Sequence, residues 1–250
     1  MAKAAYQTNE SKVYGLQACR ALFTKRPADI VKVYLAENRL KTFAELISWC
    51  VKQRKAYKVV KLDELEKLTE SVHHEGICLI AKEPVIPAWK EILRTLSHPD
   101  KATCLIYLDG VSNPHNIGNI LRSAAHFGIP YVLAGEPTPR QLPASARRVA
   151  EGGAEAVTFM GATAQSLTDL QKAGFVLVGT SSHAKTSLFR FEMPKRCIFL
   201  LGEESGGLAK AVLKLTDHTV TIPGTGRVES LNVASAAAVL FAEYGRMTAS

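Results

Sequence analysis

Three segments of the sequence combine side chains capable of chemistry with a glycine-rich turn or a helix start. The first, residues 108–128, carries Asn116 and Arg122 just after an apolar stretch. In open α/β sheets, ligands bind beyond the carboxyl ends of strands, where helix N-termini offer free N–H groups. Six residues correspond to about 600° of helical rotation, so Asn116 must precede the helix if both side chains line one site. Otherwise Asn116 caps the helix and Arg122 is a solvated surface residue.

The second segment, residues 198–208, is an apolar stretch that leads into an acidic, glycine-rich turn containing Gly202 and Glu204. Glycines let the backbone approach a ligand closely, and a neighbouring carboxylate can hold a hydroxyl or balance a cation. Adjacent carboxylates would repel a phosphate, so this turn favours a cationic cofactor such as a sulfonium. Neither a G-x-G-x-x-G nor a G-x-x-x-x-G-K-[ST] motif occurs here. A tight turn alone also accounts for the glycines.

The third segment, residues 220–239, begins as an apolar strand that stops at Pro223 and continues as a glycine-rich loop. Ser230 and Asn232 then precede an alanine-rich stretch of high helix propensity. Either residue is a suitable helix N-cap. The small side chains of residues 234–238 also allow the helix to pack very closely against another backbone.

The elements that position these segments belong to a domain over residues 101–250. Continuous apolar runs alternate there with helical patterns, which predicts an α/β fold with a mostly parallel sheet covered on both faces. The expected strands are residues 104–108, 131–134, 176–179, 198–201 and 220–222. Residues 161–174 are expected to form an ordinary helix.

Residues 1–82 predict a separate small α/β unit. The expected helices are residues 13–23, 42–55 and 64–69, the last capped by Asp63, and the expected strands are residues 30–35, 59–60 and 77–81. Residues 83–100 contain three prolines, which indicates a linker, with one helical piece over Trp89–Leu96.

The charge is unevenly distributed. The chain has a net charge of +8, of which residues 1–97 carry +6, from 17 Lys and Arg against 11 Asp and Glu, and the rest carries +2. This pattern suggests that the first part holds an anionic partner while the second does the chemistry, although simple solubility explains it equally well.

Other features narrow the class of protein. The five cysteines are widely spaced without a C-x-x-C pair, so we expect reduced core thiols rather than disulfides or a zinc site. There is no signal-peptide pattern and no run of 18 apolar residues, which predicts a soluble cytoplasmic protein without a membrane span.

In their order and spacing, the three segments resemble the motifs of the SpoU (TrmH) family of RNA 2′-O-ribose methyltransferases, within the SPOUT superfamily. The matching residues are Asn116, Gly118 and Arg122 (N-x-G-x-x-x-R), Leu201, Gly202, Glu204, Gly207 and Leu208 (L-G-x-E, then G-L), and residues 230–233 (S-L-N-V). The resemblance covers residues 104–246. Residues 13–81 resemble, more weakly, the L30e-like substrate-binding domain of this family.

The resemblance implies a SPOUT α/β-knot with a deep trefoil knot, which sequence reasoning alone would not propose. It also implies a homodimer formed through the catalytic domain, RNA bound by the basic N-terminal domain, no metal, and S-adenosyl-L-methionine as cofactor. The residues that it assigns to the cofactor are Thr180, Leu201, Gly202, Ile222, Ser230 and Leu231.

Arg122 is the catalytic residue that the resemblance implies. A guanidinium stays protonated at ordinary pH, so we expect Arg122 to hold an adjacent phosphate and stabilise charge on the 2′-oxygen rather than remove a proton. The residues expected to shape the site and orient the nucleophile are Asn116, Glu204, Ser230 and Asn232. In-line methyl transfer then depends largely on alignment.

Two positions depart from the family pattern. Glu151 stands where many members have a serine in a K-x-S-x-G-A stretch, and the first motif has Asn113 before its proline where Asp is frequent.

Two alternatives to a methyltransferase stay open. One is an RNA-binding paralogue with little or no methyltransferase activity, and the other is a nucleotide-dependent oxidoreductase on a doubly wound sheet. The second lacks a dinucleotide fingerprint after the first strand of the domain. Among RNA substrates, ribosomal RNA is favoured over tRNA because the N-terminal unit resembles a ribosomal-protein fold.

Overall fold

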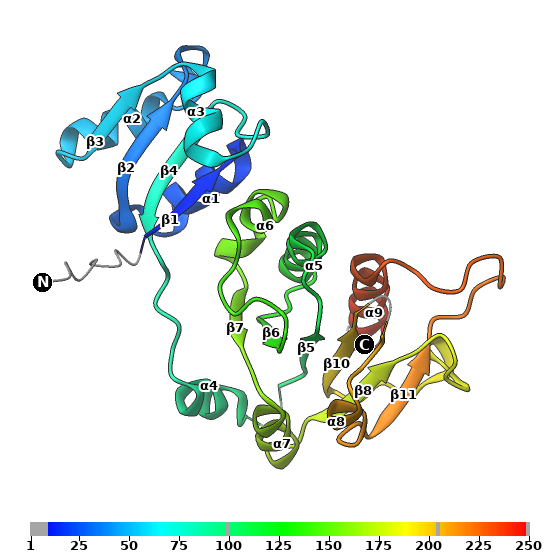
Figure 1. Cartoon of the computed structure of the whole chain (residues 1–250). Coiled ribbons are helices and arrows are strands. Elements are labelled where there is room, and N and C mark those ends of the chain that lie inside the picture. The colour runs from blue at the N-terminus through cyan, green and yellow to red at the C-terminus, as the bar shows by residue number, and fades with distance from the viewer. Residues whose placement is uncertain (1–9, 99–100, 204–205, 249–250) are drawn as a thin grey trace, which may run out of the picture. The chain divides into compact units, whose positions relative to one another are not determined.

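The computed structural model describes residues 10–98, 101–203 and 206–248 of the chain. The chain divides between Val85 and Ile86 into two compact units, each with its own sheet and core (Figure 1). All five cysteines are buried with free thiols, as expected. None of the described helices is long and apolar enough to cross a membrane.

The N-terminal unit is built on a four-stranded sheet of order β1-β4-β2-β3. β1 and β2 run antiparallel to β4, whereas β3 runs parallel to β2. Cys19 and Leu22 of the first helix and Leu46 of the second are buried against this sheet. Its elements are β1 (Glu10–Tyr14), α1 (Leu16–Lys25), β2 (Ile30–Leu35), α2 (Ala44–Lys52), β3 (Ala56–Val59), α3 (Leu62–Thr69) and β4 (Ile77–Lys82).

The C-terminal unit is built on a seven-stranded sheet of order β7-β6-β5-β10-β8-β11-β9, in which every described strand pair is parallel. Its strands are β5 (Thr103–Asp109), β6 (Tyr131–Gly135), β7 (Thr158–Gly161), β8 (Val176–Thr180), β9 (Thr186–Ser187), β10 (Arg196–Gly202) and β11 (His218–Thr221). Its α-helices are α4 (Trp89–Leu96), α5 (Pro114–His126), α6 (Ala144–Val149), α7 (Ala164–Lys172), α8 (Lys210–Leu213) and α9 (Val233–Thr248).

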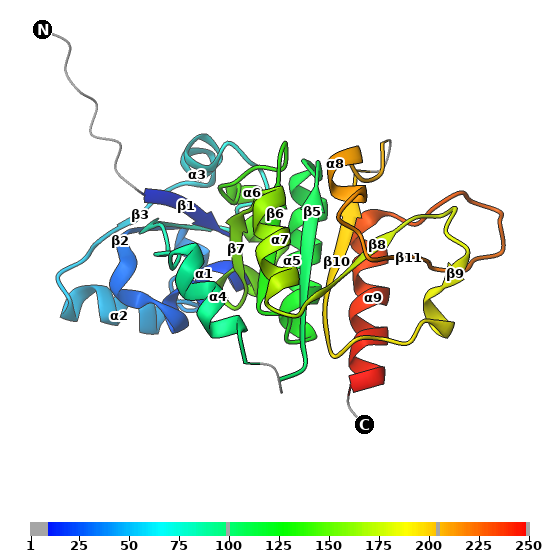
Figure 2. The same cartoon turned by 90° about the horizontal axis from the view of Figure 1, so that it is seen from below.

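Helices cover both faces of this sheet. Ile106 and its alternate neighbours on β5 pack with α5, α6 and α9, whereas Leu105 and Tyr107 pack with α4, α7 and α8. Figures 1 and 2 show the two helical layers on opposite sides of the strands. Because both faces are buried, the strands are apolar throughout rather than alternating, which explains the apolar runs in the sequence. The predicted α/β fold with a mostly parallel sheet is confirmed, and the trefoil knot stays a prediction.

Most predicted elements are present, but several helix starts differ. The helix expected from Val13 is wrong at its beginning, because Val13 and Tyr14 belong to β1 and pair with Leu79 and Cys78 of β4. Local periodicity cannot detect such a distant partner. Asp63 is not the cap of α3, since the helix begins one residue earlier, at Leu62. Asp63 lies in the first turn instead, where a negative charge favours the positive end of the helix.

The helix expected over residues 161–174 is shorter in the structure. Gly161 ends β7, and α7 begins at Ala164 after Thr163, whose hydroxyl accepts the Ser166 N–H. The sequence did not predict β7 and β9. Both are short strands at the two edges of the sheet, with four and two residues, so neither forms a long apolar run.

Candidate active site

The three motif segments meet at the carboxyl-terminal edge of the large sheet, where its parallel strands end. β5, β10, β8 and β11 are consecutive neighbours in the sheet and run parallel. Asp109 at the end of β5 lies opposite Gly202 at the end of β10, and Thr180 at the end of β8 lies opposite Val220. Ligands of open α/β sheets bind at this edge. Segments about 90 and 110 residues apart are therefore brought to one place.

A small cavity of about 240 Å³ opens at this edge. Its lining includes Asn116 from the first motif and Glu203 from the second, together with Val233 at the start of α9. The other lining residues, Gly110, Val111, Ser112 and Asn113, form the turn between β5 and α5. The cavity is therefore bounded by parts of all three motif segments.

Asn116 lies in the first turn of α5, not in the turn before it, so helix geometry does not place it on one face with Arg122. The helix begins at Pro114, and its cap is Asn113, whose side chain accepts the His115 N–H at 2.8 Å. Proline is well tolerated at this position because the first N–H groups of a helix have no intrahelical partner. The cap frees the Asn116 side chain to act elsewhere.

A side-chain hydrogen bond joins the first and third motifs. Asn232 Nδ2 donates to Asn116 Oδ1 over 3.0 Å, and Asn232 Oδ1 accepts the Ala234 N–H at 2.9 Å. Asn232 therefore caps α9 with its carbonyl oxygen and binds α5 with its amino group. An aspartate would retain the cap but could not donate to Asn116, so an amide is required for both contacts.

Only glycine fits at position 202, because the loop that follows returns close to it. A Cβ at this position would lie 2.0 Å from the carbonyl carbon of Gly207. The loop is closed by the Gly207 N–H, which donates to the carbonyl of Glu203 over 3.0 Å. The tight turn considered for this segment is therefore present. Glu204, predicted to shape the site, lies outside the described residues.

Asp109 was not among the predicted site residues. It is buried at the end of β5, and its carboxylate accepts the Ala209 N–H at 2.7 Å, which fastens the far end of the 202–209 loop. Burial raises the pKa of Asp109, and the nearby Glu203 raises it further, whereas the Ala209 N–H opposes both effects. A charged residue at the end of an apolar run, just before Gly110, was the signal in the sequence.

The residues assigned to the cofactor fall into two groups. Thr180, Leu201, Gly202 and Ile222 lie at the strand ends, and the Thr180 hydroxyl donates to the carbonyl of Leu200 over 3.1 Å. The Leu201 side chain is in the core, so only its backbone can face a ligand at this edge. Ser230 and Leu231, by contrast, are exposed in a loop over residues 223–232 (Figure 1).

Arg122 lies six residues beyond Asn116 on α5 and does not line the cavity. Its Nη2 atom is 3.0 Å from Oε2 of Glu151, and both side chains are about half exposed. The structure therefore brings Arg122 to Glu151 and Asn116 to Asn232. Glu151 is one of the two departures from the family pattern. Within the described residues, no group of three or more His, Cys, Asp or Glu side chains could hold a metal ion.

Comparison with known proteins supports this interpretation of the fold and identifies the family. The family model described as the SpoU rRNA Methylase family matches residues 103–242, and one described as RNA 2′-O ribose methyltransferase substrate binding matches residues 12–86. The chain belongs to the SpoU rRNA methylase family. The resemblance seen in the sequence is thereby confirmed, with an RNA 2′-O-methyltransferase as the class of enzyme, and the oxidoreductase alternative is not supported.

Two relatives illustrate this membership. An uncharacterized tRNA/rRNA methyltransferase, YfiF, of Escherichia coli O157:H7 is 36% identical over 96% of this chain and 69% of its own length. The 23S rRNA (guanosine-2′-O-)-methyltransferase RlmB of Coxiella burnetii is 34% identical over 94% of both chains.

Solved structures share the fold. The SpoU methyltransferase AviRb from Streptomyces viridochromogenes, in complex with AdoMet, gives a TM-score of 0.78 at 21% identity, over 95% of this chain and 90% of that one. An RNA 2′-O ribose methyltransferase gives a TM-score of 0.81 at 21% identity, over 97% and 90%.

Substitutions at Asp109 test whether its hydrogen bond to the Ala209 N–H stabilises the structure. We expect Asp109→Ala to lower the free energy of unfolding by roughly 1–3 kcal/mol, because the Ala209 N–H loses its acceptor. Asp109→Asn keeps an acceptor oxygen and should change stability by less than about 1 kcal/mol. Urea denaturation of the full chain measures both. Equal losses in the two variants would contradict a role for this hydrogen bond.

The same pair tests the raised pKa. A carboxyl whose pKa is raised by folding stabilises the fold at low pH and loses this contribution as the pH rises through the folded-state pKa. Asp109→Asn should remove that part of the pH dependence.

Proposed function

We propose that this protein transfers a methyl group from S-adenosyl-L-methionine to a ribose 2′-hydroxyl of RNA, with ribosomal RNA as the first candidate substrate and the cytoplasm as its location. The hydrogen bond between Asn116 and Asn232 carries this proposal, because it assembles the first and third motifs beside the second. Membership of the SpoU rRNA methylase family and the activity named for RlmB relatives support it.

The carboxyl ends of β8, β10 and β11 are the proposed cofactor site. Thr180, Gly202 and Ile222 lie there, and the exposed loop with Ser230 and Leu231 would cover the ligand, as would the backbone of Leu201. When bound, S-adenosyl-L-methionine supplies a methyl group on a positively charged sulfonium. Glu203, which lines the cavity, provides negative charge that complements such a cation. AviRb, which shares the fold, has been solved with AdoMet. We also propose that this unit forms the deep trefoil knot that the family resemblance implies.

Arg122 is the proposed catalytic residue. Its guanidinium would hold an RNA phosphate through two N–H groups and stabilise the charge that develops on the 2′-oxygen. Asn116, Asn232, Ser230 and Glu204 would orient the ribose. Because a guanidinium remains protonated, Arg122 acts by charge and alignment and leaves proton removal to solvent or another group.

Arg122→Ala tests this assignment. We expect methylation of in-vitro transcribed 23S ribosomal RNA to fall at least a hundredfold, because charge stabilisation of this kind typically gives about 10²–10³ in rate. S-adenosylmethionine affinity, measured by calorimetry, should stay within about twofold of wild type, since Arg122 is not among the cofactor residues.

Loss of cofactor binding together with activity would contradict the assigned role of Arg122. If the wild-type protein binds this RNA and the cofactor but transfers no methyl group to any RNA tested, the chain is the RNA-binding paralogue with little activity.

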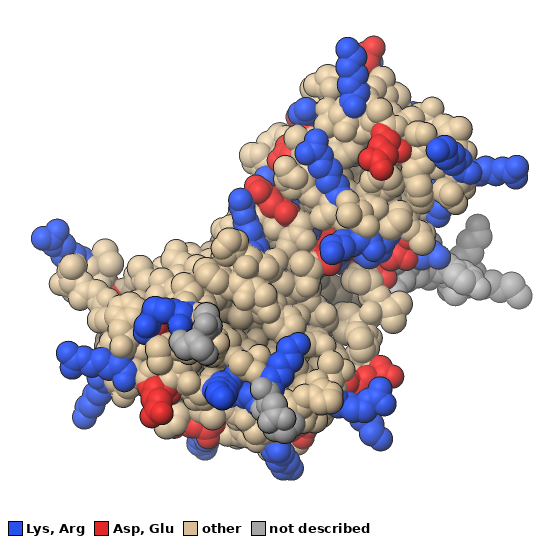
Figure 3. Space-filling view, turned by 180° about the vertical axis from the view of Figure 1, so that it is seen from behind, with Lys and Arg blue, Asp and Glu red and all other residues tan. Residues whose placement is uncertain are grey.

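The N-terminal unit is the proposed RNA-binding domain. We propose residues 1–82 as this domain, residues 83–100 as the linker and residues 101–250 as the catalytic domain, and the substrate-binding match over residues 12–86 supports the first of these. The structure divides the chain at Val85 and groups α4 of the linker with the C-terminal unit. Figure 3 shows Lys and Arg side chains spread over the surface of both units on this face rather than gathered into one patch. A segment in which basic residues are concentrated therefore indicates an RNA contact better than the net charge of the whole unit does.

Residues 52–61 provide such a concentration. This segment contains five Lys and Arg and no acidic residue, and it is almost entirely exposed. Lys58 is partly neutralised by Glu64 at 3.3 Å, whereas Lys52 and Arg54 are exposed. Tyr57 on β3, an edge strand, exposes 42% of its surface and could stack on an unpaired base. We propose that this segment contacts RNA.

The double variant Lys52→Glu, Arg54→Glu tests this contact. RNA affinity should fall at least tenfold, and the slope of log affinity against log salt should decrease by about 0.7–0.9 for each phosphate that the protein no longer neutralises. Filter binding at several salt concentrations measures both. The control Lys90→Glu, Arg94→Glu on α4 makes the same change in net charge at two exposed residues. Equal losses in both double variants would mean that only net charge matters.

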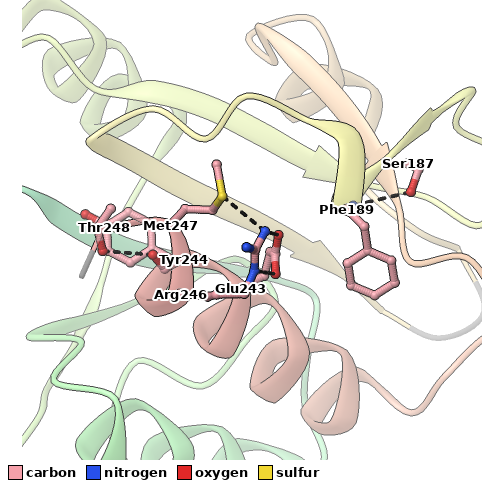
Figure 4. Close-up of polar contacts among 7 residues, drawn as sticks. All are labelled: Ser187, Phe189, Glu243, Tyr244, Arg246, Met247 and Thr248. Carbon is pink, nitrogen blue, oxygen red and sulfur yellow. Dashed lines mark hydrogen bonds and ion pairs between the residues drawn. The ribbon is translucent and has the colours of Figure 1, made fainter. Parts of the chain in front are cut away.

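The homodimer is proposed to form through the end of α9. Phe127, Phe189 and Met247 are partly exposed, and the Phe127 ring lies 6.4 Å from that of Phe241 on α9. The charge nearby is neutralised within the helix, because Arg246 donates two hydrogen bonds to Glu243 and thereby lowers its pKa (Figure 4). The end of α9 therefore offers apolar surface without an unpaired buried charge.

Met247→Glu is expected to raise the dissociation constant of the dimer at least tenfold, because it places a charge on the proposed apolar interface. Sedimentation velocity over a concentration series gives this constant. Val72→Glu, at a more exposed apolar residue of the N-terminal unit, is the control. A wild-type protein that remains monomeric at micromolar concentration would overturn the proposed dimer.

A further inference from the structure

The ion pair between Arg122 and Glu151 joins the proposed catalytic residue to a carboxylate from another element. Nη2 of Arg122 lies 3.0 Å from Oε2 of Glu151. Glu151 stands in the turn between α6 and the 3₁₀ helix η3 (Gly153–Glu155). This contact uses one side of the guanidinium, which has five N–H donors, so others stay available to a phosphate.

Close backbone contacts fix this turn against α5 at the level of Arg122. A Cβ at Gly153 would lie 2.7 Å from the carbonyl oxygen of Leu121 and 3.0 Å from the Cα of Arg122. Four residues earlier on α5, a Cβ at Gly118 would lie 2.6 Å from Cβ of Val149. The backbone of the turn is thus held on both sides of Glu151, which fixes where its side chain starts relative to Arg122.

Glu151 also has an unusual backbone conformation for its residue type. Its φ angle is 46°, in the left-handed region that favours glycine. The turn itself would form more easily with glycine at this position. The geometry of the turn therefore does not explain the glutamate, whereas its contact with Arg122 does.

We propose that Glu151 is a positioning residue for Arg122: it holds the guanidinium in one orientation before RNA binds, so that its remaining N–H groups meet the phosphate and the 2′-oxygen. An arginine side chain that is more than half exposed otherwise samples many rotamers. The carboxylate also lies beside the phosphate that Arg122 would bind, so it opposes RNA affinity while favouring the reactive alignment. This inference rests on the proposed function.

Two substitutions at Glu151 separate positioning from a structural role. Glu151→Gly removes the carboxylate and relaxes the left-handed backbone, so the turn should be retained or stabilised. Glu151→Gln removes the charge but keeps an oxygen that can accept from Arg122. The control is Glu136→Ala, which removes the acidic partner of Arg140 from another exposed ion pair of the same unit.

Steady-state methylation of in-vitro transcribed 23S ribosomal RNA gives the first readout. We expect Glu151→Gly to lower kcat about tenfold without raising KM for the RNA, and Glu151→Gln to recover at least a third of wild-type kcat. Glu136→Ala should match wild type. A kcat for Glu151→Gly within twofold of wild type, or a loss expressed only as a higher KM, would overturn the proposal.

A second readout does not depend on activity. Phenylglyoxal modifies accessible arginines, and peptide mass spectrometry gives the rate at Arg122 in the full chain without RNA. Glu151→Gly should raise this rate at least threefold, with Glu151→Gln between it and wild type. An unchanged rate would overturn the positioning role even if methylation is seen, whereas a raised rate in a protein without methyltransferase activity would refute the proposed function alone.

Discussion

The hydrogen bond between Asn232 and Asn116 is the contact on which the arrangement of the site depends. It links residues 116 positions apart and holds the start of α9 against the start of α5, while Asn232 also caps α9. Both helices pack on the same face of the sheet, and this bond joins their N-termini to each other beside the strand ends. Both N-termini border the cavity, because Asn116 and Val233 line it.

A second hydrogen bond anchors the second motif, residues 198–208. The carboxylate of Asp109 at the end of β5 accepts the Ala209 N–H. Gly202, at the other end of the 202–209 loop, leaves room for the close approach of Gly207. The three loops of the site thus start from β5, β10 and β11, which lie within four consecutive strands of the sheet, and side chains tie them to elements that are distant in sequence. The acidic Glu203 lines the cavity, whereas Arg122 lies on α5 outside its lining. This separation suits a site that takes a cationic cofactor and an anionic substrate from different sides.

The sequence was sufficient for the fold class and for most elements, because strands buried on both faces are continuously apolar and helices such as Trp89–Leu96 show clear periodicity. The sequence failed where pairing with a distant strand determines the secondary structure, as for Val13 in β1 and for the short edge strand β9. In the site, motif spacing identified Asn116 and Asn232 but not their mutual bond. Neither Asp109 as a fastener nor Glu151 as the partner of Arg122 could be predicted, since both roles arise from packing between separate elements.

Calorimetric titration of the purified full chain with S-adenosylmethionine, with S-adenosylhomocysteine alongside, tests the central claim most directly. A site built from the ends of β8, β10 and β11 and the loop carrying Ser230 and Leu231 predicts saturable binding of both compounds at about one site per chain. Repeating the titration with RNA present covers a site that forms only with substrate. Absence of binding in both titrations would contradict the account, because no methyl donor would then reach the 2′-hydroxyl.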